Sequence, residues 1–270
     1  MKQRTIKRKV SIEDIGLHFG NSVKMTLSPD IENSGITFFI DQARKKFYKL
    51  SPFEIFDTML ATKLGNSDCF VSTIEHLLSV LHACYITNIQ ITICGNEIPI
   101  LDGSAKNIYD LIQASGIIEQ HSNVDIFKIE KNISIIENES YIKAYPYNGF
   151  KIHYVFEKEN KFIGNKEYTF NSFNDFYRDI CPARTFGKFE DIEKMKSMGL
   201  IKGGNLNNAV VYTDNEILNL EGLRFEDEFI RHKILDFIGD IYCLGPIFGY
   251  FEIKNSGHYL NNKFCRLCLS

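Results

Sequence analysis

The order of strand-like and helix-like segments repeats on either side of a polar segment near the middle of the chain, 120–124. Before this segment, the apolar patterns predict strands at 5–10, 23–27 and 89–93, and helices at 72–82 and up to about residue 115. After it, the same patterns predict strands at 125–129, 141–144, 150–156, 208–212 and 247–253, and helices at 173–180, 189–198 and 225–240. Two halves that each mix a sheet with helices indicate an α+β fold of two similar domains, which we place at 1–122 and 123–270.

The composition narrows the class of protein. The chain has 270 residues, of which 44% are hydrophobic, so it can bury a large core as one large domain or two of ordinary size. A net charge of −3 does not favour nucleic acid or an anionic membrane surface as a partner. The basic start, Met1–Lys9, leads into no apolar run, and Cys265 and Cys268 form a single CxxC pair without a second one. We expect a cytoplasmic protein without a membrane span.

The segment 225–240 carries an informative helical pattern. One arc of this helix and the residue after it are apolar: Ile230, Ile234, Phe237, Ile238 and Ile241. The opposite stripe holds His232, Asp236 and Asp240, and a histidine and an aspartate four residues apart can bind the same metal ion. The stripe is therefore either a solvated helix face or half of a metal site. Phe225 and Phe229 fall on the same stripe, and we expect both to be substantially buried.

A second candidate pair, Glu75 and His76, lies in the first predicted helix. Ser72 and Glu75 match a capping box, in which Glu75 would only satisfy the start of the helix and His76 would lie on the surface. In the alternative interpretation, His76 binds a metal and Glu75 is a base beside it. With His232 and Asp236 this makes a three-ligand set with an open position, the stoichiometry of catalytic zinc. The same ligand types also form the Fe(II) site of non-haem oxygenases.

Two further segments combine polar candidates with ordinary explanations. His258 lies in a predicted glycine-containing loop, where most histidines have no chemical role although loops often carry function. Thr185 lies in a predicted turn between two helices, and its hydroxyl could donate a hydrogen bond to a developing oxyanion. The apolar residues that follow, including Ile192 and Ile201, form either core or a slot for an acyl chain.

Taken together, these fragments occur in one specific order. The motifs are Ser72–His76, Asp102-Gly103-Ser104, Ala183–Gly187, Leu223–Asp240 and Ser256-Gly257-His258. In these motifs the chain resembles the UDP-3-O-acyl-N-acetylglucosamine deacetylases of bacterial lipid A biosynthesis. The resemblance runs from Lys2 to Lys263, which is essentially the whole chain.

The resemblance implies a cytoplasmic bacterial zinc hydrolase that removes acetate from the amide of a UDP-linked, 3-O-acylated glucosamine, the committed step of lipid A synthesis. It implies two domains, each a β-sheet layer packed on a helix layer, with the active site at the domain interface. The implied ligands of zinc, with ferrous iron as the alternative metal, are His76, His232 and Asp236. The other implied roles are Glu75 as general base, His258 as general acid or oxyanion stabiliser, Asp240 as its tuning partner, Thr185 as oxyanion ligand, and Lys233 as a substrate contact. Phe186 and the apolar segment with Ile192 and Ile201 would line the acyl-chain passage.

Some features leave the prediction open. Ala61 stands where some relatives have a cysteine near the metal, which argues against an additional ligand there. The passage region contains Lys188, Asn205 and Asn208, so the preferred acyl-chain length does not follow from the sequence. A non-haem Fe(II) oxygenase and a binding module without turnover are the competing function classes. We expect a monomer that binds a small-molecule UDP-sugar, with no nucleic-acid partner and no stable membrane insertion.

Overall fold

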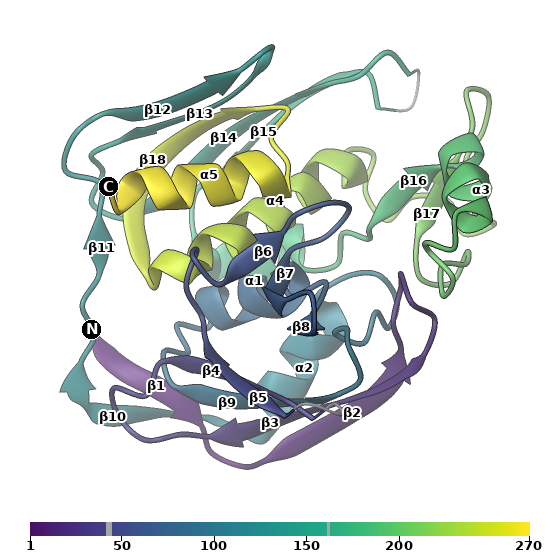
Figure 1. Ribbon diagram of the computed structural model, residues 1–270. Helices are drawn as coiled ribbons and strands as arrows, with labels where there is room; N and C mark the ends of the chain where they lie inside the picture. The colour runs from purple at the N-terminus through teal and green to yellow at the C-terminus, as the bar shows by residue number, and fades with distance from the viewer. Residues whose placement is uncertain (42–44, 161–162) are drawn as a thin grey trace.

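Two sheets with the same strand order form the outer layers of the protein, and four helices lie between them (Figure 1). The computed structural model describes residues 1–41, 45–160 and 163–270. The first sheet has the order β2 (Val10–Ile15), β3 (Ser22–Pro29), β9 (Ile89–Cys94), β4 (Ile36–Ile40) and β5 (Lys46–Lys49). The second has the order β12 (Ile133–Glu137), β13 (Ser140–Tyr145), β18 (Ile247–Lys254), β14 (Phe150–Glu157) and β15 (Asn165–Phe170). The inner helices are α1 (Glu75–Ala83), α2 (Lys106–Ser115), α4 (Glu228–Asp240) and α5 (His258–Cys268).

The two halves repeat the same connectivity. In each sheet the first three neighbouring strands are antiparallel, the central strand pairs in parallel with the fourth, and the fourth pairs antiparallel with the fifth. The central strand is β9 in the first half and β18 in the second. In each half, the helix that precedes the central strand in sequence and the helix that follows it cover the sheet. The expected α+β fold with two similar halves is confirmed, although the sequence contains no literal repeat.

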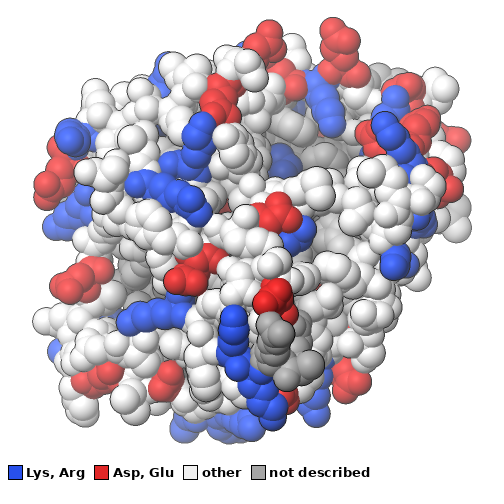
Figure 2. Space-filling view, viewed as in Figure 1, with Lys and Arg blue, Asp and Glu red and all other residues white. Residues whose placement is uncertain are grey.

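The strands bury one face only. In β3 the side chains of Val23, Met25 and Leu27 are buried, whereas Lys24 is exposed between them. A period of two residues places alternate side chains on opposite faces of a sheet, so the apolar set points to the helices and the polar set to solvent. On the face drawn in Figure 2, lysine and arginine are interspersed with aspartate and glutamate.

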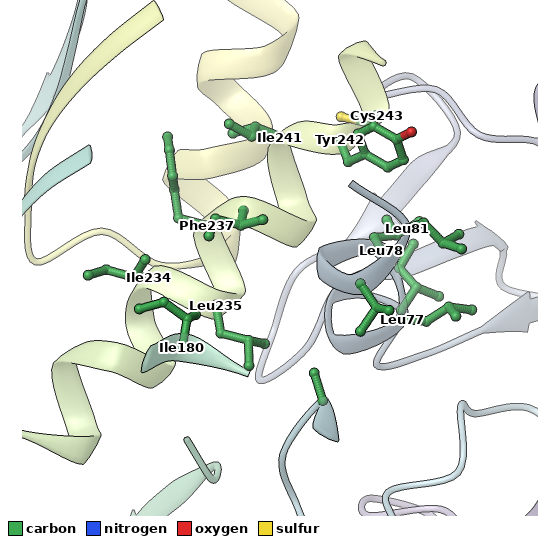
Figure 3. Close-up of a cluster of buried hydrophobic side chains, with 14 of the residues drawn as sticks. Leu77, Leu78, Leu81, Ile180, Ile234, Leu235, Phe237, Ile241, Tyr242 and Cys243 are labelled. Carbon is green, nitrogen blue, oxygen red and sulfur yellow. The ribbon is translucent and has the colours of Figure 1, made fainter. Parts of the chain in front are cut away.

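Helices α1 and α4 pack directly against each other in the centre of the protein. Leu77, Leu78 and Leu81 of α1 lie near Leu235 and the other apolar side chains of α4 and the segment after it (Figure 3). Each such side chain contributes about 1.5–3 kcal/mol when fully buried. Gly239 makes the close approach possible, because a Cβ there would lie 2.0 Å from the carbonyl oxygen of Glu75.

Smaller elements flank this core. They are the sheet β6 (Ile55–Asp57), β7 (Lys63–Asn66) and β8 (Cys69–Val71), the pair β1 (Lys2–Ile6) and β10 (Ile117–Asn123), and β11 (Phe127–Lys128), which joins β18. A lobe at the right of Figure 1 contains β16 (Phe186–Lys188), α3 (Phe189–Ser197) and β17 (Val210–Tyr212). Short helical turns are η1 (Phe173–Asp175), η2 (Phe176–Ile180) and η3 (Ile241–Leu244).

The structure corrects several expected elements. The polar segment 120–124 is largely strand β10, whose backbone pairs with β1. The expected domain boundary between residues 122 and 123 falls at the end of this strand and stays a prediction. His258 begins helix α5 and does not lie in a loop. The helix expected at 225–240 begins only at Glu228. Among the described residues, no helix is long and apolar enough to cross a membrane.

Candidate active site

Helices α1 and α4 bring together the three predicted metal ligands. His76 lies in the first turn of α1, and His232 and Asp236 lie one turn apart on α4. One ligand atom of each lies within 4.8 Å of the others, with His232 Nε2 3.4 Å and His76 Nε2 4.0 Å from Asp236 Oδ1. All three side chains are buried. The solvated helix face, one of the two interpretations of the stripe on α4, is therefore wrong.

The protonation of these three groups suits cation binding. Burial, reinforced by the neighbouring His232, lowers the pKa of His76 to about 3, and burial also lowers the pKa of His232. The His232 Nδ1–H donates a hydrogen bond to the carbonyl of Ala183 at 3.1 Å, so the Nε2 lone pair points to the cluster. Burial raises the pKa of Asp236, but the charge of Lys233 and the neighbouring histidines together outweigh burial, and the net pKa lies well below the usual range. The cluster offers two neutral imidazoles and one carboxylate.

A second cluster lies beside the first and joins Glu75, Asp240 and His258. His258 Nδ1 donates to Asp240 Oδ2 at 2.8 Å, and His258 Nε2 lies 4.0 Å from Glu75 Oε1. Asp240 also accepts hydrogen bonds from the Thr62 hydroxyl at 2.5 Å and the Asn261 amide at 2.7 Å. Asp240 is therefore held on three sides and fixes the orientation of the His258 ring.

The two groups that face each other across this cluster have raised pKa values. Burial raises the pKa of Glu75; the charge of His258 opposes this increase, and the charges of Asp240 and Asp236 add to it. Burial lowers the pKa of His258, but the charges of Asp240 and Glu75 outweigh burial and raise it to about 9. His258 is therefore protonated at neutral pH, and Glu75 titrates far above an ordinary carboxyl group.

Thr185 is positioned across the interface between the two halves. Its N–H donates to the carbonyl of Gly103 at 2.8 Å, and a Cβ on Gly103, at φ +82°, would lie 2.1 Å from the carbonyl oxygen of Asn208. Asp102 binds Ser104 at 2.8 Å and the guanidinium of Arg224 at 2.8 Å. The Asp102-Gly103-Ser104 motif of the first half therefore contacts the segment that carries Thr185 and fixes its position.

One cavity adjoins the clusters, and a second is lined by the residues predicted for the acyl-chain passage. The first, about 130 Å³, is lined by the predicted residues of both clusters other than Asp240 and by Thr185, Phe186 and Lys233. Lys233 Nζ donates to Asp236 Oδ2 at 2.6 Å, so it contacts a predicted ligand as well as the cavity. The second, about 160 Å³, is predominantly apolar and is lined by Ile192 and Ile201, with Asn205 at its wall.

The expectation for the two aromatic residues near α4 was half correct. Phe229 is buried and its ring lies 4.8 Å from the ring of Phe186. Phe225 is only half-buried, and the guanidinium of Arg231 lies 4.4 Å from its ring centre. Phe225 precedes the helix, so its position does not follow from the helical period.

Several residues of the site were missed at the sequence level. His18, Thr73 and Leu60 line the first cavity, yet the glycine-flanked turn around His18 was the only available signal. Burial, with the charge of Lys63, lowers the pKa of His18 to about 4, so its ring is neutral. The capping-box interpretation was wrong, because α1 begins at Glu75 without a side-chain cap and Glu75 Oε2 accepts from the Thr62 N–H at 3.1 Å.

The site combines a buried set of two histidines and one aspartate with a neighbouring carboxylate and a protonated imidazole. This combination is typical of metal-dependent hydrolases. The chain belongs to the UDP-3-O-acyl N-acetylglycosamine deacetylase (LpxC) family, whose model matches residues 3–270. It is 43% identical to the UDP-3-O-acyl-N-acetylglucosamine deacetylase of Campylobacter fetus over 100% of this chain and 92% of the relative. The deacetylases of Oleidesulfovibrio alaskensis (42% identical, 98% and 88% covered) and Neisseria meningitidis serogroup A (41% identical, 100% and 91% covered) are similar relatives.

Proposed function

We propose that this protein hydrolyses the N-acetyl amide of a UDP-linked, 3-O-acylated N-acetylglucosamine and releases acetate, as the committed step of lipid A biosynthesis. The observation that carries the proposal is the meeting of the two clusters at one cavity, His76, His232 and Asp236 on one side and Glu75 and His258 on the other. An amide is a poor electrophile and its amine a poor leaving group, so its hydrolysis needs an electrophile, a base and an acid in one place.

The donor set fits a divalent metal ion. His76, His232 and Asp236 provide two neutral nitrogens and an ionised oxygen, which suits zinc and also ferrous iron. A metal ion bound there supplies a Lewis acid that polarises the amide carbonyl and lowers the pKa of water. Ala61, although fully buried near this site, adds no ligand atom.

Glu75 is the proposed general base. Its carboxylate lies at the cavity wall, held by the Thr62 N–H, and its raised pKa makes it a stronger base than an exposed glutamate. It takes the proton from the water that attacks the amide carbon. The adjacent His76 ties this base to the metal-type cluster through a single peptide link.

His258 is the proposed general acid. Its Nδ1–H is occupied by Asp240, so the Nε2–H is the proton that can be transferred to the leaving nitrogen. The raised pKa keeps that proton in place near neutral pH. Thr185 and Lys233, at the same cavity, are the proposed hydrogen-bond donors to the oxyanion and to the substrate.

The cavities suit the parts of such a substrate. Phe186, Ile192 and Ile201 lead from the first cavity toward the apolar second one, which is the proposed acyl-chain passage. On its other side His258 borders a larger, open cavity of about 370 Å³ that includes Ser140 and Asn255, where we place the polar UDP group. We keep the two domains at 1–122 and 123–270, a monomer and a cytoplasmic location as proposals.

Acetate release tests the proposal directly. Purified protein loaded with zinc should release acetate from the UDP-sugar substrate without oxygen, and Glu75→Ala should lower kcat by a factor on the order of 100 or more. His153→Ala, a change on the outer face of the second sheet, serves as the control. Full activity of Glu75→Ala would refute the mechanism, and tight substrate binding without any turnover would refute the activity itself.

A further inference from the structure

Glu97 is a fully buried carboxylate that the proposed chemistry does not use. It accepts hydrogen bonds from the N–H of His18 at 3.0 Å, the N–H of Phe19 at 3.2 Å and the hydroxyl of Thr73 at 2.8 Å. Burying a carboxylate is costly unless several donors satisfy it, and here the donors come from two separate segments of the cavity wall. Glu97 therefore links these segments by its side chain.

The first of the linked segments is strained. Thr73 has φ +61°, in the left-handed region that β-branched residues rarely occupy. It lines the first cavity and lies two residues before Glu75. Backbone strain of this kind persists only where surrounding contacts hold it, and the hydrogen bond to Glu97 is such a contact.

The second segment is the turn that carries His18. A Cβ on Gly16 would lie 2.2 Å from Glu97 Oε2, so this turn is folded closely around the carboxylate. The carbonyl of His18 accepts from Lys202 N at 3.0 Å, and that of Leu17 from Gly203 N at 3.0 Å. The turn therefore also contacts the loop beside Ile201 of the proposed acyl-chain passage.

We propose that Glu97 is a positioning residue that holds the His18 turn and the strained turn before Glu75 at a fixed separation in the wall of the first cavity. The first test of this role measures acetate release and therefore rests on the proposed deacetylase function. The second test measures the binding of zinc alone and is independent of that function.

The variant Glu97→Gln keeps the size of the side chain but replaces one acceptor oxygen by an NH₂ donor, which would face N–H or O–H donors. We expect kcat for acetate release at saturating zinc to fall by a factor on the order of 10 to 100, with KM nearly unchanged, because Glu75 and the cavity wall are displaced together. The control is Asn88→Ala, which removes another buried polar side chain, one whose oxygen accepts from the Gly35 N–H at the start of strands β4 and β9 and that does not line the first cavity. It should lower the melting temperature without lowering kcat.

An unchanged kcat in Glu97→Gln, or an equal loss in Asn88→Ala, would overturn the proposal. If the wild-type protein binds zinc but releases no acetate, the deacetylase function is refuted, and the zinc Kd of the two proteins then tests the role of Glu97. A zinc Kd about tenfold higher in Glu97→Gln than in the wild type supports the positioning role of Glu97 through the turn before His76, and an unchanged zinc Kd overturns it.

A second pair of variants decides the question even if Glu97→Gln does not fold. Thr73→Ala and Thr73→Gly both remove the hydroxyl that binds Glu97, but only glycine adopts φ +61° without strain. If the bond to Glu97 holds a strained turn in place, kcat of Thr73→Gly should exceed that of Thr73→Ala by a factor on the order of 5. Equal kcat values, or the reverse order, would show that the turn does not need to be held.

Discussion

Asp240→Asn is expected to move the alkaline limit of activity to lower pH. The proposed mechanism needs His258 protonated, and Asp240 Oδ2 accepts the His258 Nδ1–H at 2.8 Å in a buried setting. An opposite charge at this distance favours the charged imidazole, so removing it lowers the pKa of His258. Asparagine has nearly the same shape and keeps one oxygen for Thr62, but its NH₂ replaces the oxygen that accepts from His258 and Asn261, so the charge and these two hydrogen bonds are lost together.

The size of the effect follows from the pKa. His258 has a pKa of about 9 in the wild-type protein. Loss of a close buried opposite charge lowers the pKa of a histidine by about 1 to 3, so we expect the pKa of His258 to fall by about 2. At pH 8 the protonated fraction would then fall from about nine-tenths to about one-tenth, a tenfold loss of rate, whereas at pH 6 the loss would nearly vanish.

The assay is kcat/KM for acetate release between pH 5.5 and 10 (on the order of half-unit steps), because this quantity reports the ionisations of the free enzyme. Glu252→Gln, on the outer face of β18, removes the same charge far from His258 and should leave the profile unchanged. A uniform loss at every pH in Asp240→Asn, with the alkaline limit unmoved, would refute the argument that Asp240 acts by keeping His258 protonated.

Three further changes test the packing and the passage. Gly239→Ala places a methyl group 2.0 Å from the carbonyl of Glu75, so it should separate α1 from α4 and lower the free energy of unfolding by about 1–3 kcal/mol in urea, with weaker zinc binding. Arg184→Met leaves the buried Glu228, now paired with Arg184 at 2.9 Å, without its cation, and should cost about 3–5 kcal/mol by the same measurement. Ile192→Trp fills the 160 Å³ apolar cavity and should raise KM for long acyl chains but not for short ones, as substrates of graded chain length would show.

Local patterns predicted the elements whose faces differ in polarity. Strand β3 was recognised because one of its faces is buried and the other is not, and α1 was recognised by the helical period of its apolar stripe, although its polar face is buried as well. The first residues of α5 were assigned to a loop, since Gly257 suggested a break and the helix begins directly after it. Strand β10 was missed because its residues are polar and its order comes from pairing with β1. Where pairing and not side-chain burial holds a segment, the sequence carries little signal.

The chemistry of the site was readable from residue types, and its assembly was not. Glu75-His76 and His232-x-x-x-Asp236 are each compatible with a solvated surface, and only the order of motifs along the chain raised them above that interpretation. The contact between the two pairs joins residues more than 150 positions apart, and Gly239 permits it by removing a side chain where the helices meet. Glu97 and His18 had no comparable motif.

The sequence by itself determined which residues can bind a cation, donate a proton or bury an apolar face, because these are properties of side chains and of the helix and strand periods. The tertiary structure alone decided that the stripe of His232, Asp236 and Asp240 is buried rather than solvated. The polarity of a helix face does not reveal what packs on it. The burial that shifts the pKa values of Glu75 and His76 arises only when α1 is placed against α4.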